Sequence, residues 1–391
     1  MLAAIFLLSA GAEGPCDTYV RNGSPCVEAH SMTTSTDAAI HSMFEAIHAS
    51  LVRNSESKSE SSSDQIALRR VTAYGMPFWL AIGPVGKNEE SKSASTLPAG
   101  RWANKMYHSG HFHSHGEATM FAAILRQSGC VDVASGQQRL VLDVGANSGF
   151  FTMLAAAYGC RVVAFEPHGT WASLMQLSVA ANGFGDRVVI HNAVATNETA
   201  VVYDGWHAVA PPGVDTSPQP EDVARDARWW KGAGRGNRRG RGSAAQQVMR
   251  LANATVRVDA VVSNSEEVLY MKVDVEGHEP SVLSSARWLL ATQRVRFLFF
   301  EATVRSDERA SKITEYAAHV ASLAEQHKYA FYLMQKTIKP ALRRLPAGKA
   351  AAEWFVHHAS EQFAKNEKSS VQLEFLAVRA GVAPPTAVAV F

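Results

Sequence analysis

Short apolar runs, most of them closed by a glycine or an acidic residue, recur from residue 140 towards the carboxyl terminus. A short apolar run between turn residues is typical of a buried strand, and apolar residues three or four positions apart are typical of a helix. The expected strands are 140–144, 161–167, 187–195, 268–273, 295–300, 329–334 and 372–378. The expected helices are 117–126, 150–158, 170–182, 279–290 and 307–328. This alternation predicts an α/β fold: a seven-stranded, mostly parallel sheet with helices on both faces, whose last strands form an antiparallel hairpin at one edge.

The chain before residue 106 does not follow this alternation. We predict a helix at 33–52, a serine-rich polar linker at 54–64 and a β-hairpin over 71–84. The chain then divides into an apolar start (1–15), a variable, partly disordered region (16–105), the α/β domain (106–380) and a loose tail (381–391). A glycine- and arginine-rich insert at 211–245 interrupts the domain, and its composition predicts disorder. Strands at 201–203 and 256–261 are expected to pair antiparallel around it.

The amino-terminal segment and the cysteines bear on location. Residues 2–10 are apolar but too few to span a membrane, and no Lys or Arg precedes them. They are either the core of a secretory signal or the start of a truncated gene model, so cytoplasmic and secretory locations both stay open. Apart from this candidate signal we expect no transmembrane helix. Cys16 and Cys26 can pair in an oxidising compartment, whereas Cys130 and Cys160 are expected as buried thiols.

A glycine-rich turn follows the first expected strand, in the segment RLVLDVGANSG at Arg139–Gly149. Glycine permits a positive φ and lets a ligand approach the backbone, and the next helix start offers free N–H groups. A dinucleotide fingerprint would need glycine at Asn147 and Phe150, so this site is of another kind. The pattern D-x-G-x-x-x-G resembles the first motif of Rossmann-like, S-adenosylmethionine (SAM)-dependent methyltransferases. In that class the loop holds the amino-acid end of the cofactor and the acid lies beside its ammonium group.

Polar residues also end the next two expected strands. Glu166 lies 21 residues after Gly145. An acid about 20 residues past such a turn can accept hydrogen bonds from both ribose hydroxyls of a nucleotide, although it can also simply cap the following helix. Asn192 and Ala193 end the third strand, where methyltransferases of this type contact the adenine. The Asn192 amide, or a backbone carbonyl, would replace the acid that is common at that place.

The fourth expected strand runs into LYMKVDVEGHE, with Asp274, Glu276, His278 and Glu279 at its end. Ligands of open α/β sheets bind outside the carboxyl ends of the strands, so this cluster is a candidate site. The carboxylates can alternatively hold a divalent metal that binds an acceptor diol, but no fourth ligand is evident and we predict no metal. The structural alternative for residues 276–278 is a turn that caps the following helix.

In order and spacing, DVGANSGFFT, VVAFEP, MKVDVEGHEPSVL and FLFFEAT resemble the FkbM family of methyltransferases, over about residues 118–301. The resemblance implies a Rossmann-like fold, SAM as the cofactor and O-methylation of a hydroxyl on a sugar, glycan or small metabolite. The implied cofactor-binding residues are Asp143, Gly145, Ala146, Asn147, Gly149, Glu166, Asn192 and Ala193. The first hundred residues and the insert lie outside it.

Methyl transfer to a hydroxyl needs an acceptor oxygen held in line with the methyl–sulfur bond and a base that removes its proton. We rank His278 first as this base because an imidazole titrates near neutral pH, and Asp274 second because it should lie nearest the methyl group. Glu276 can orient His278 or bind substrate hydroxyls. The sequence Asp-Val-Glu-Gly at 274–277, in place of an Asn/Asp-Pro-Pro-aromatic motif, favours O-methylation.

Other functions stay open. The insert's tip, KGAGRGNRRGRG, can be the phosphate-binding arm of an RNA or protein methyltransferase, although a solvated loop extension is favoured. A net charge of +2 indicates no particular polyanion as partner. A non-catalytic SAM-binding protein is the other alternative, and the intact acids and glycine of the motifs argue against it. The histidines at 108, 111, 113 and 115 favour a surface loop over a metal site. The oligomeric state is not indicated.

Overall fold

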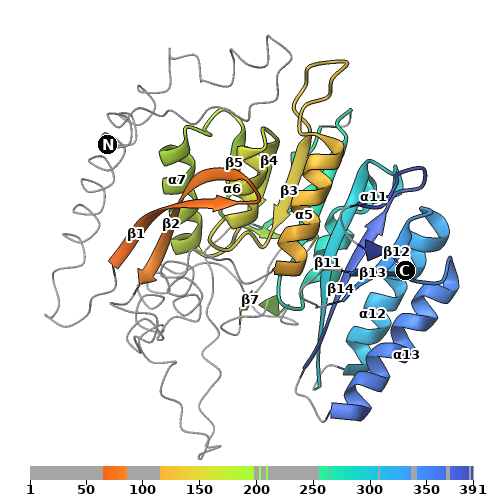
Figure 1. Ribbon diagram of the computed structural model, residues 1–391. Helices are drawn as coiled ribbons and strands as arrows, with labels where there is room; N and C mark the ends of the chain where they lie inside the picture. The colour runs from red at the N-terminus through yellow and green to blue at the C-terminus, as the bar shows by residue number, and fades with distance from the viewer. Residues whose placement is uncertain are drawn as a thin grey trace, which may run out of the picture.

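The computed structural model describes residues 65–85, 115–197, 202–203, 208–209, 255–263, 265–306, 309–335, 341–366, 370–386 and 389–390. Within these ranges the chain forms an α/β fold around one large sheet (Figure 1). Some predictions fall outside the described residues: the helix at 33–52, the linker at 54–64, the pairing of Cys16 with Cys26 and the insert at 211–245. The side chains of the four histidines at 108–115 are not described either.

The predicted parallel strands form one half of a nine-stranded sheet, whose order is β15-β13-β12-β14-β11-β10-β3-β4-β5. The parallel strands are β3 (Leu140–Val144), β4 (Arg161–Phe165), β5 (Val188–His191), β10 (Val268–Val273) and β11 (Val295–Arg305). Every residue of β3 and β10 is buried. Burial on both faces explains why these runs are apolar without alternation, and the predicted fold class is confirmed.

The other half of the sheet, antiparallel except for the parallel pair of β13 and β15, differs from the prediction. It contains β12 (Ala330–Gln335), β13 (Ala341–Arg344), β14 (Ser370–Val378) and β15 (Ala389–Val390). Strands β12 and β14 do pair antiparallel, but β14 also pairs with β11, and β13 and β15 extend the sheet beyond β12. The expected edge hairpin is therefore an internal pair, and the expected loose tail supplies β15. Local apolar patterning marks strands but leaves their partners unspecified, which accounts for the two missing strands.

The helices are α5 (His115–Ser128), α6 (Phe150–Ala157), α7 (Gly169–Asn182), α9 (Val258–Val261), α10 (Glu279–Ser285), α11 (Arg287–Ala291), α12 (Arg309–Ala321) and α13 (Lys349–Asn366). The predicted helix 279–290 divides at Ala286, and the predicted helix 307–328 is α12 followed by a π-helical turn at Ser322–Gln326. The sequence reading did not include α13. None of the described helices is both long and apolar enough to cross a membrane.

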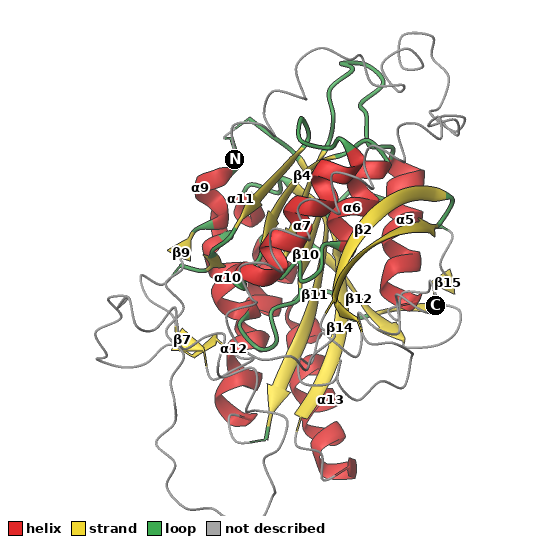
Figure 2. Cartoon of the chain, turned by 90° about the vertical axis from the view of Figure 1, so that its left-hand side faces the viewer, coloured by secondary structure: helices red, strands yellow, loops and turns green. Residues whose placement is uncertain are grey.

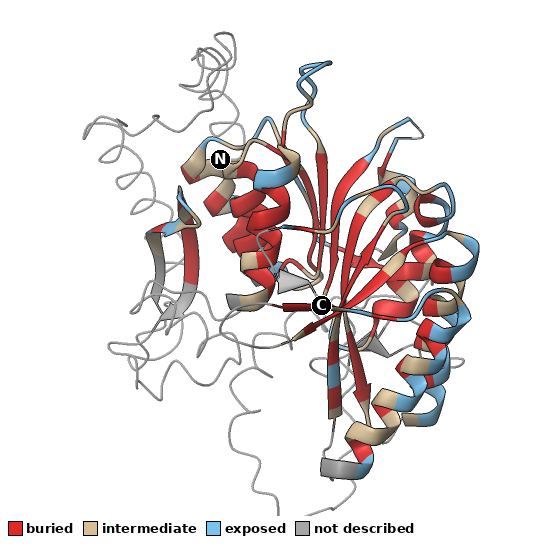
Figure 3. Ribbon diagram, turned by 45° about the vertical axis from the view of Figure 1, so that its right-hand side comes forward, coloured by how far each residue is buried: buried red, intermediate tan, exposed pale blue. Residues whose placement is uncertain are grey.

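Two apolar cores, one on each face, hold the sheet between its helices (Figure 2). One core joins the sheet to α10, α11, α12 and α13, and the other joins it to α5, α6 and the β-hairpin. Strand alternation separates them: on β11, Leu298 and Phe300 face the first core, whereas Phe297 and Phe299 face the second. Figure 3 shows the strands buried and the outward sides of the helices exposed.

The predicted hairpin is confirmed as β1 (Gln65–Ala73) and β2 (Met76–Val85). Its edge docks on α7 through side chains: the Asn182 amide bonds to the backbone N–H and C=O of Trp79, both at 2.7 Å, and Ser178 accepts the N–H of Ala81. These contacts satisfy backbone groups that a free sheet edge would leave exposed. The hairpin is thus an outer layer of the domain.

Two local predictions were wrong. Strand β7 (Val202–Tyr203) pairs with β8 (Ala208–Val209), while β9 (Thr255–Val256) pairs in parallel with β6 (Val194–Ala195) and residues 258–261 are helical. Cys130 and Cys160 form a disulfide rather than two buried thiols. Cys130 follows α5, and Cys160 precedes β4. The backbone N–H of Arg139 donates to the carbonyl of Cys130, and the carbonyl of Arg139 accepts the N–H of Arg161, which is next to Cys160. The two cysteine Cα atoms therefore lie 4.5 Å apart. The crossover geometry that makes them neighbours is not visible in the sequence.

Candidate functional site

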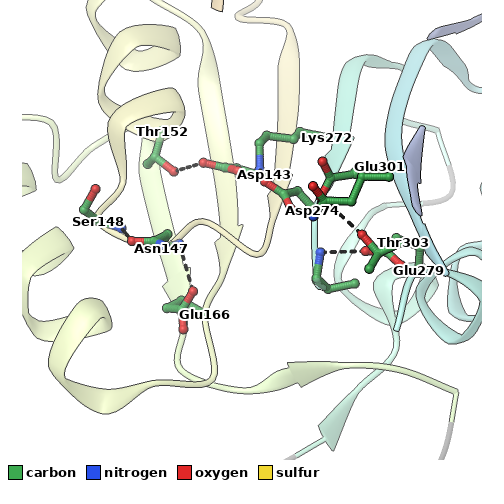
Figure 4. A network of polar contacts seen from close by, with 12 residues as sticks. Asp143, Asn147, Ser148, Thr152, Glu166, Lys272, Asp274, Glu279, Glu301 and Thr303 are labelled. Atoms are coloured by element: carbon green, nitrogen blue, oxygen red, sulfur yellow. Dashed lines mark hydrogen bonds and ion pairs between the residues drawn. The ribbon is translucent and has the colours of Figure 1, made fainter. Parts of the chain in front are cut away.

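The carboxyl ends of β3, β4, β10 and β11 bring the motif residues together (Figure 4). Because these strands are parallel and adjacent, the loops that follow them meet at one edge of the sheet. Asp143 lies in register with Lys272 on the neighbouring strand, and Val144 with Val273. The glycine turn after β3 and the acidic turn after β10 are therefore next to each other.

Gly145 is where these two turns touch. Its φ is +79°, and its N–H and that of Ala146 donate to the Phe165 carbonyl at 3.0 and 3.1 Å. A Cβ at Gly145 would lie 1.9 Å from the backbone oxygen of Asp274. Glycine is thus required here by conformation and by space, and the space is filled by the acidic turn.

Gly149 caps the start of α6 with a φ of +83°. A Cβ at this position would lie 2.5 Å from Cγ of Met175, a flexible side chain on α7. Asn147, between the glycines, also has a positive φ of 53°, which asparagine tolerates better than most residues. The turn predicted from the glycine spacing is therefore present as a left-handed loop that leads into a helix.

Glu166 lies beneath this loop and is 2% exposed. Its two carboxylate oxygens accept the backbone N–H groups of Asn147 and His168, both at 2.8 Å. Burial raises the pKa of Glu166 to about 7, against the lowering effect of these hydrogen bonds. The carboxylate thus ties the glycine loop to the end of β4, and each oxygen keeps a further lone pair.

Asn192 and Ala193 follow β5, beside Glu166. The Asn192 amide donates to the carbonyls of Glu166 and Pro167, at 2.8 and 3.1 Å. Among the described residues, no group donates to Oδ1 of Asn192, and Asn192 is an exposed residue whereas Ala193 is buried. The acceptor atom is therefore the one that a ligand can reach.

Asp143 is fully buried at the end of β3. Oδ2 accepts the Thr152 hydroxyl at 2.6 Å, whereas Oδ1 has no hydrogen-bond partner among the described residues. Burial raises the pKa of Asp143, and the nearby Lys272 opposes that rise. A buried acceptor without a donor is costly, so this atom suits a donor that arrives from outside the protein.

Lys272 is a site residue that the sequence reading missed. It sits in the central strand β10 and is 3% exposed, and its ammonium group donates to Oδ2 of Asp274 at 3.1 Å. Burial disfavours its charge, but Asp274, Glu117 and Asp143 outweigh burial and raise the pKa of Lys272 above its ordinary value. In the sequence, a lysine within the apolar run before Asp274 was the only sign that this residue belongs to the site.

Asp274 is half-buried and turned to the surface side of this ion pair. Oxygens of Asp274, Glu276 and Glu301 lie within 4.8 Å of one another, and Glu301 also accepts from Thr303 and from Gln372 of β14, both at 3.3 Å. Three such carboxylates can hold a cation in principle. We assign no metal ion to these carboxylates, because the ammonium group of Lys272 already lies beside Asp274.

Glu279 and His278 belong to the supporting structure of the acidic turn. Glu279 is fully buried and accepts the N–H groups of Val275 and Gly277, and the hydroxyl of Tyr316 on α12. Burial raises its pKa to about 7. Glu279 therefore fixes the turn that carries Asp274 and Glu276.

His278 is 5% exposed, and its Nε2 has no partner among the described residues. Burial, and then Lys312 on α12, lower its pKa to about 4, while Glu315 raises it. Its charged neighbours thus lie on α12, and Asp274 is not one of them. An imidazole in this setting is neutral at pH 7 but a weak base.

A family model for the FkbM methyltransferase domain matches residues 143–331, which run from Asp143 through the acidic turn into β12. The chain contains an FkbM methyltransferase domain. The cofactor of this family is SAM. The match includes Glu166, Asn192, Lys272 and Asp274, whereas Glu117 and Gln372 lie outside it. No curated protein matches the sequence significantly.

Several solved methyltransferases are similar to this chain at low identity. A human methyltransferase 10 domain containing protein is 10% identical, with a TM-score of 0.34, and the match covers 73% of this chain and 96% of that one. An O-methyltransferase from Bacillus cereus, in complex with SAH, is 12% identical with a TM-score of 0.24, covering 71% and 98%. StiE O-MT is 8% identical with a TM-score of 0.32, covering 75% and 83%. We draw no functional conclusion from likenesses this distant.

Proposed function

We propose that this protein is a SAM-dependent O-methyltransferase that acts on a hydroxyl of a sugar, glycan or small metabolite. One observation carries the proposal. Asp274, at the end of the central strand β10, has one oxygen held by Lys272, while its other oxygen bonds to no described residue. The same residue touches the glycine turn at Gly145. A carboxylate that is fixed at one oxygen and open at the other, beside a cofactor loop, suits removal of a proton from an acceptor.

The residues present fit the cofactor. Glu166 keeps lone pairs for the two ribose hydroxyls, and Oδ1 of the exposed Asn192 accepts from the adenine amino group, with Ala193 against the base. The orphaned Oδ1 of Asp143 suits the ammonium of the amino-acid end. The left-handed loop over Gly145, Ala146, Asn147 and Gly149 brings backbone close to that end. When bound, SAM supplies an electrophilic methyl group on a sulfonium.

The acceptor side consists of the residues around Asp274. Its open oxygen takes the proton of the acceptor hydroxyl, while Glu276 and Glu301 accept hydrogen bonds from other hydroxyls of the substrate. His278, ranked first from the sequence, is the second candidate for the base, because its low pKa and its position against α12 do not suit the role. Three carboxylates at the acceptor side repel phosphates, which disfavours RNA as the substrate.

The proposed reaction is tested by incubating the protein with SAM and a panel of neutral sugars, glycans and small phenols, and measuring S-adenosylhomocysteine (SAH) released. We expect turnover with at least one hydroxyl acceptor, and its loss in Asp274→Asn, which keeps the size of the side chain. The control is Asp186→Asn, an exposed carboxylate at the opposite end of the strands. Turnover in Asp274→Asn equal to wild type contradicts the role of Asp274, and turnover with RNA alone contradicts the acceptor class.

A further inference from the structure

A buried ammonium group lies between the cofactor half and the acceptor half of the site. Lys272 is directly beside Asp143 in the register of β3 and β10, and it bonds to Asp274 two residues further along its own strand. Because strand side chains alternate, residues 272 and 274 point to the same face. Figure 4 shows Asp143, Lys272 and Asp274 side by side.

The surroundings of this ammonium are acidic and otherwise apolar. Glu117 of α5 is 7% exposed, and its charge raises the pKa of Lys272. The ring centroid of Phe151, the second residue of α6, lies 5.2 Å from Nζ of Lys272. The charge of Lys272 also lowers the pKa of Glu166 at the end of β4, although burial outweighs this effect. Lys272 is thus the cation that Asp143, Glu117 and Asp274 share, and no other cation among the described residues influences Asp143 as strongly.

The charges do not balance in this cluster. One ammonium faces Asp143, which is fully buried, and Asp274, which is half-buried, and the charge of Asp274 raises the pKa of Asp143. Among the described residues, Lys272 is the cation that lowers the pKa of Asp143, so removing the ammonium would let Asp143 bind a proton more readily. A cationic ligand that arrives would expel this proton.

We propose that Lys272 is a positioning residue that holds Asp274 aimed at the acceptor and couples it to the cofactor side through Asp143. This rests on the proposed function. Lys272 fixes one oxygen of Asp274 and leaves the other for the acceptor proton, while its charge opposes proton uptake by Asp143. The same ammonium therefore interacts with the carboxylate on the cofactor side and with the one on the acceptor side, and removing the charge of Asp274 changes the affinity for the sulfonium.

Calorimetric titration of SAM into the protein, repeated in two buffers of different ionisation enthalpy, measures the protons exchanged on binding. Wild type, Lys272→Met and Lys272→Arg are compared at pH 7.5. Met removes the charge and keeps much of the stem, and Arg restores the charge. We expect Lys272→Met to release about half to one proton more than wild type per SAM bound, and Lys272→Arg to match wild type. Any proton from Glu166 is common to the three proteins and cancels in the comparison.

5′-Methylthioadenosine, which lacks the ammonium-bearing amino-acid end, is the control ligand, and it should expel no additional proton from Lys272→Met. Circular dichroism checks that each variant is folded. If Lys272→Met does not fold, Asp274→Asn decides instead: SAM affinity should fall at least about threefold while SAH affinity stays unchanged, because only SAM carries the charge that the carboxylate favours. Asp186→Asn is the matched control and should alter neither.

The outcomes separate two failures. Equal proton counts in folded wild type and Lys272→Met, or equal losses of SAM and SAH affinity in Asp274→Asn, overturn the role of Lys272 and leave the proposed function intact. Absence of SAM binding by folded wild type overturns the proposed function itself.

Discussion

Gly145 offers the sharpest test of how the two halves of the site are packed together. Replacing it with alanine adds one Cβ to a residue whose φ is +79°, at a place 1.9 Å from the Asp274 carbonyl oxygen and 2.8 Å from its carbon. Gly159 supplies a matched control, because its φ is +89° but a Cβ there meets nothing within 4 Å. The two substitutions share the backbone cost and differ in the collision.

The backbone cost of a left-handed alanine is about 1–2 kcal/mol, and it applies to both variants. The collision at Gly145 is with backbone, which cannot rotate away, and the contact must widen from 1.9 Å to at least 3.0 Å. Overpacking of this kind typically costs about 1–3 kcal/mol. We therefore expect Gly145→Ala to lower the free energy of unfolding by about 2–5 kcal/mol and Gly159→Ala by about 1–2 kcal/mol.

Thermal unfolding measures this difference, and titration with SAM measures its consequence. At about 2–4 °C per kcal/mol for a domain of this size, Gly145→Ala should melt roughly 4–20 °C below wild type, and Gly159→Ala clearly less. Separation of the turns should also weaken SAM binding about tenfold or more in Gly145→Ala only, which corresponds to about 1.4 kcal/mol. Equal melting temperatures and equal SAM affinities for the two variants would refute the close packing of the glycine turn on the acidic turn.

Three further outcomes are expected. Replacing Cys130 and Cys160 together with alanine should lower the free energy of unfolding by about 3–4 kcal/mol, since the disulfide closes a loop with a sequence separation of 30; a reductant that leaves the melting temperature of wild type unchanged would argue against the bond. Glu166 has a pKa raised from 4.5 to about 7, so the folded state binds a proton more tightly than the unfolded one, and stability should fall as the pH rises from about 4.5 to about 7; a flatter denaturation profile in Glu166→Gln is the check. SAM affinity should rise over pH 6 to 8 as Glu166 ionises, and a pH-independent dissociation constant would contradict its role.

The sequence was sufficient for those parts of the site whose chemistry is local. The spacing between Asp143, Gly145 and Gly149 favours a tight turn after a buried strand, and the structure has positive φ at both glycines. The position of Glu166 follows from the length of one strand–helix–strand crossover. Such features depend on few residues that are close together in the chain, so they can be predicted from the sequence alone.

The remaining features depend on contacts between distant segments. Lys272 reads as an ordinary charged residue until β3, α5 and α6 enclose it, and Cys130 meets Cys160 only through the crossover of β3. His278 was ranked first as the base because an imidazole ordinarily titrates near neutral pH, and the sequence does not show that burial and Lys312 of α12 lower its pKa to about 4. A one-dimensional pattern does not specify which element covers a side chain, and burial then decides its charge.

The central claim is that the glycine turn and Glu166 form a SAM site, and direct titration of SAM and SAH into the purified protein tests it. The comparison is wild type against Glu166→Ala, with Glu353→Ala, an exposed change on α13, as the control. The account predicts binding in the micromolar range for wild type and the control, and its loss in Glu166→Ala. A folded wild-type protein that binds neither compound would contradict the account.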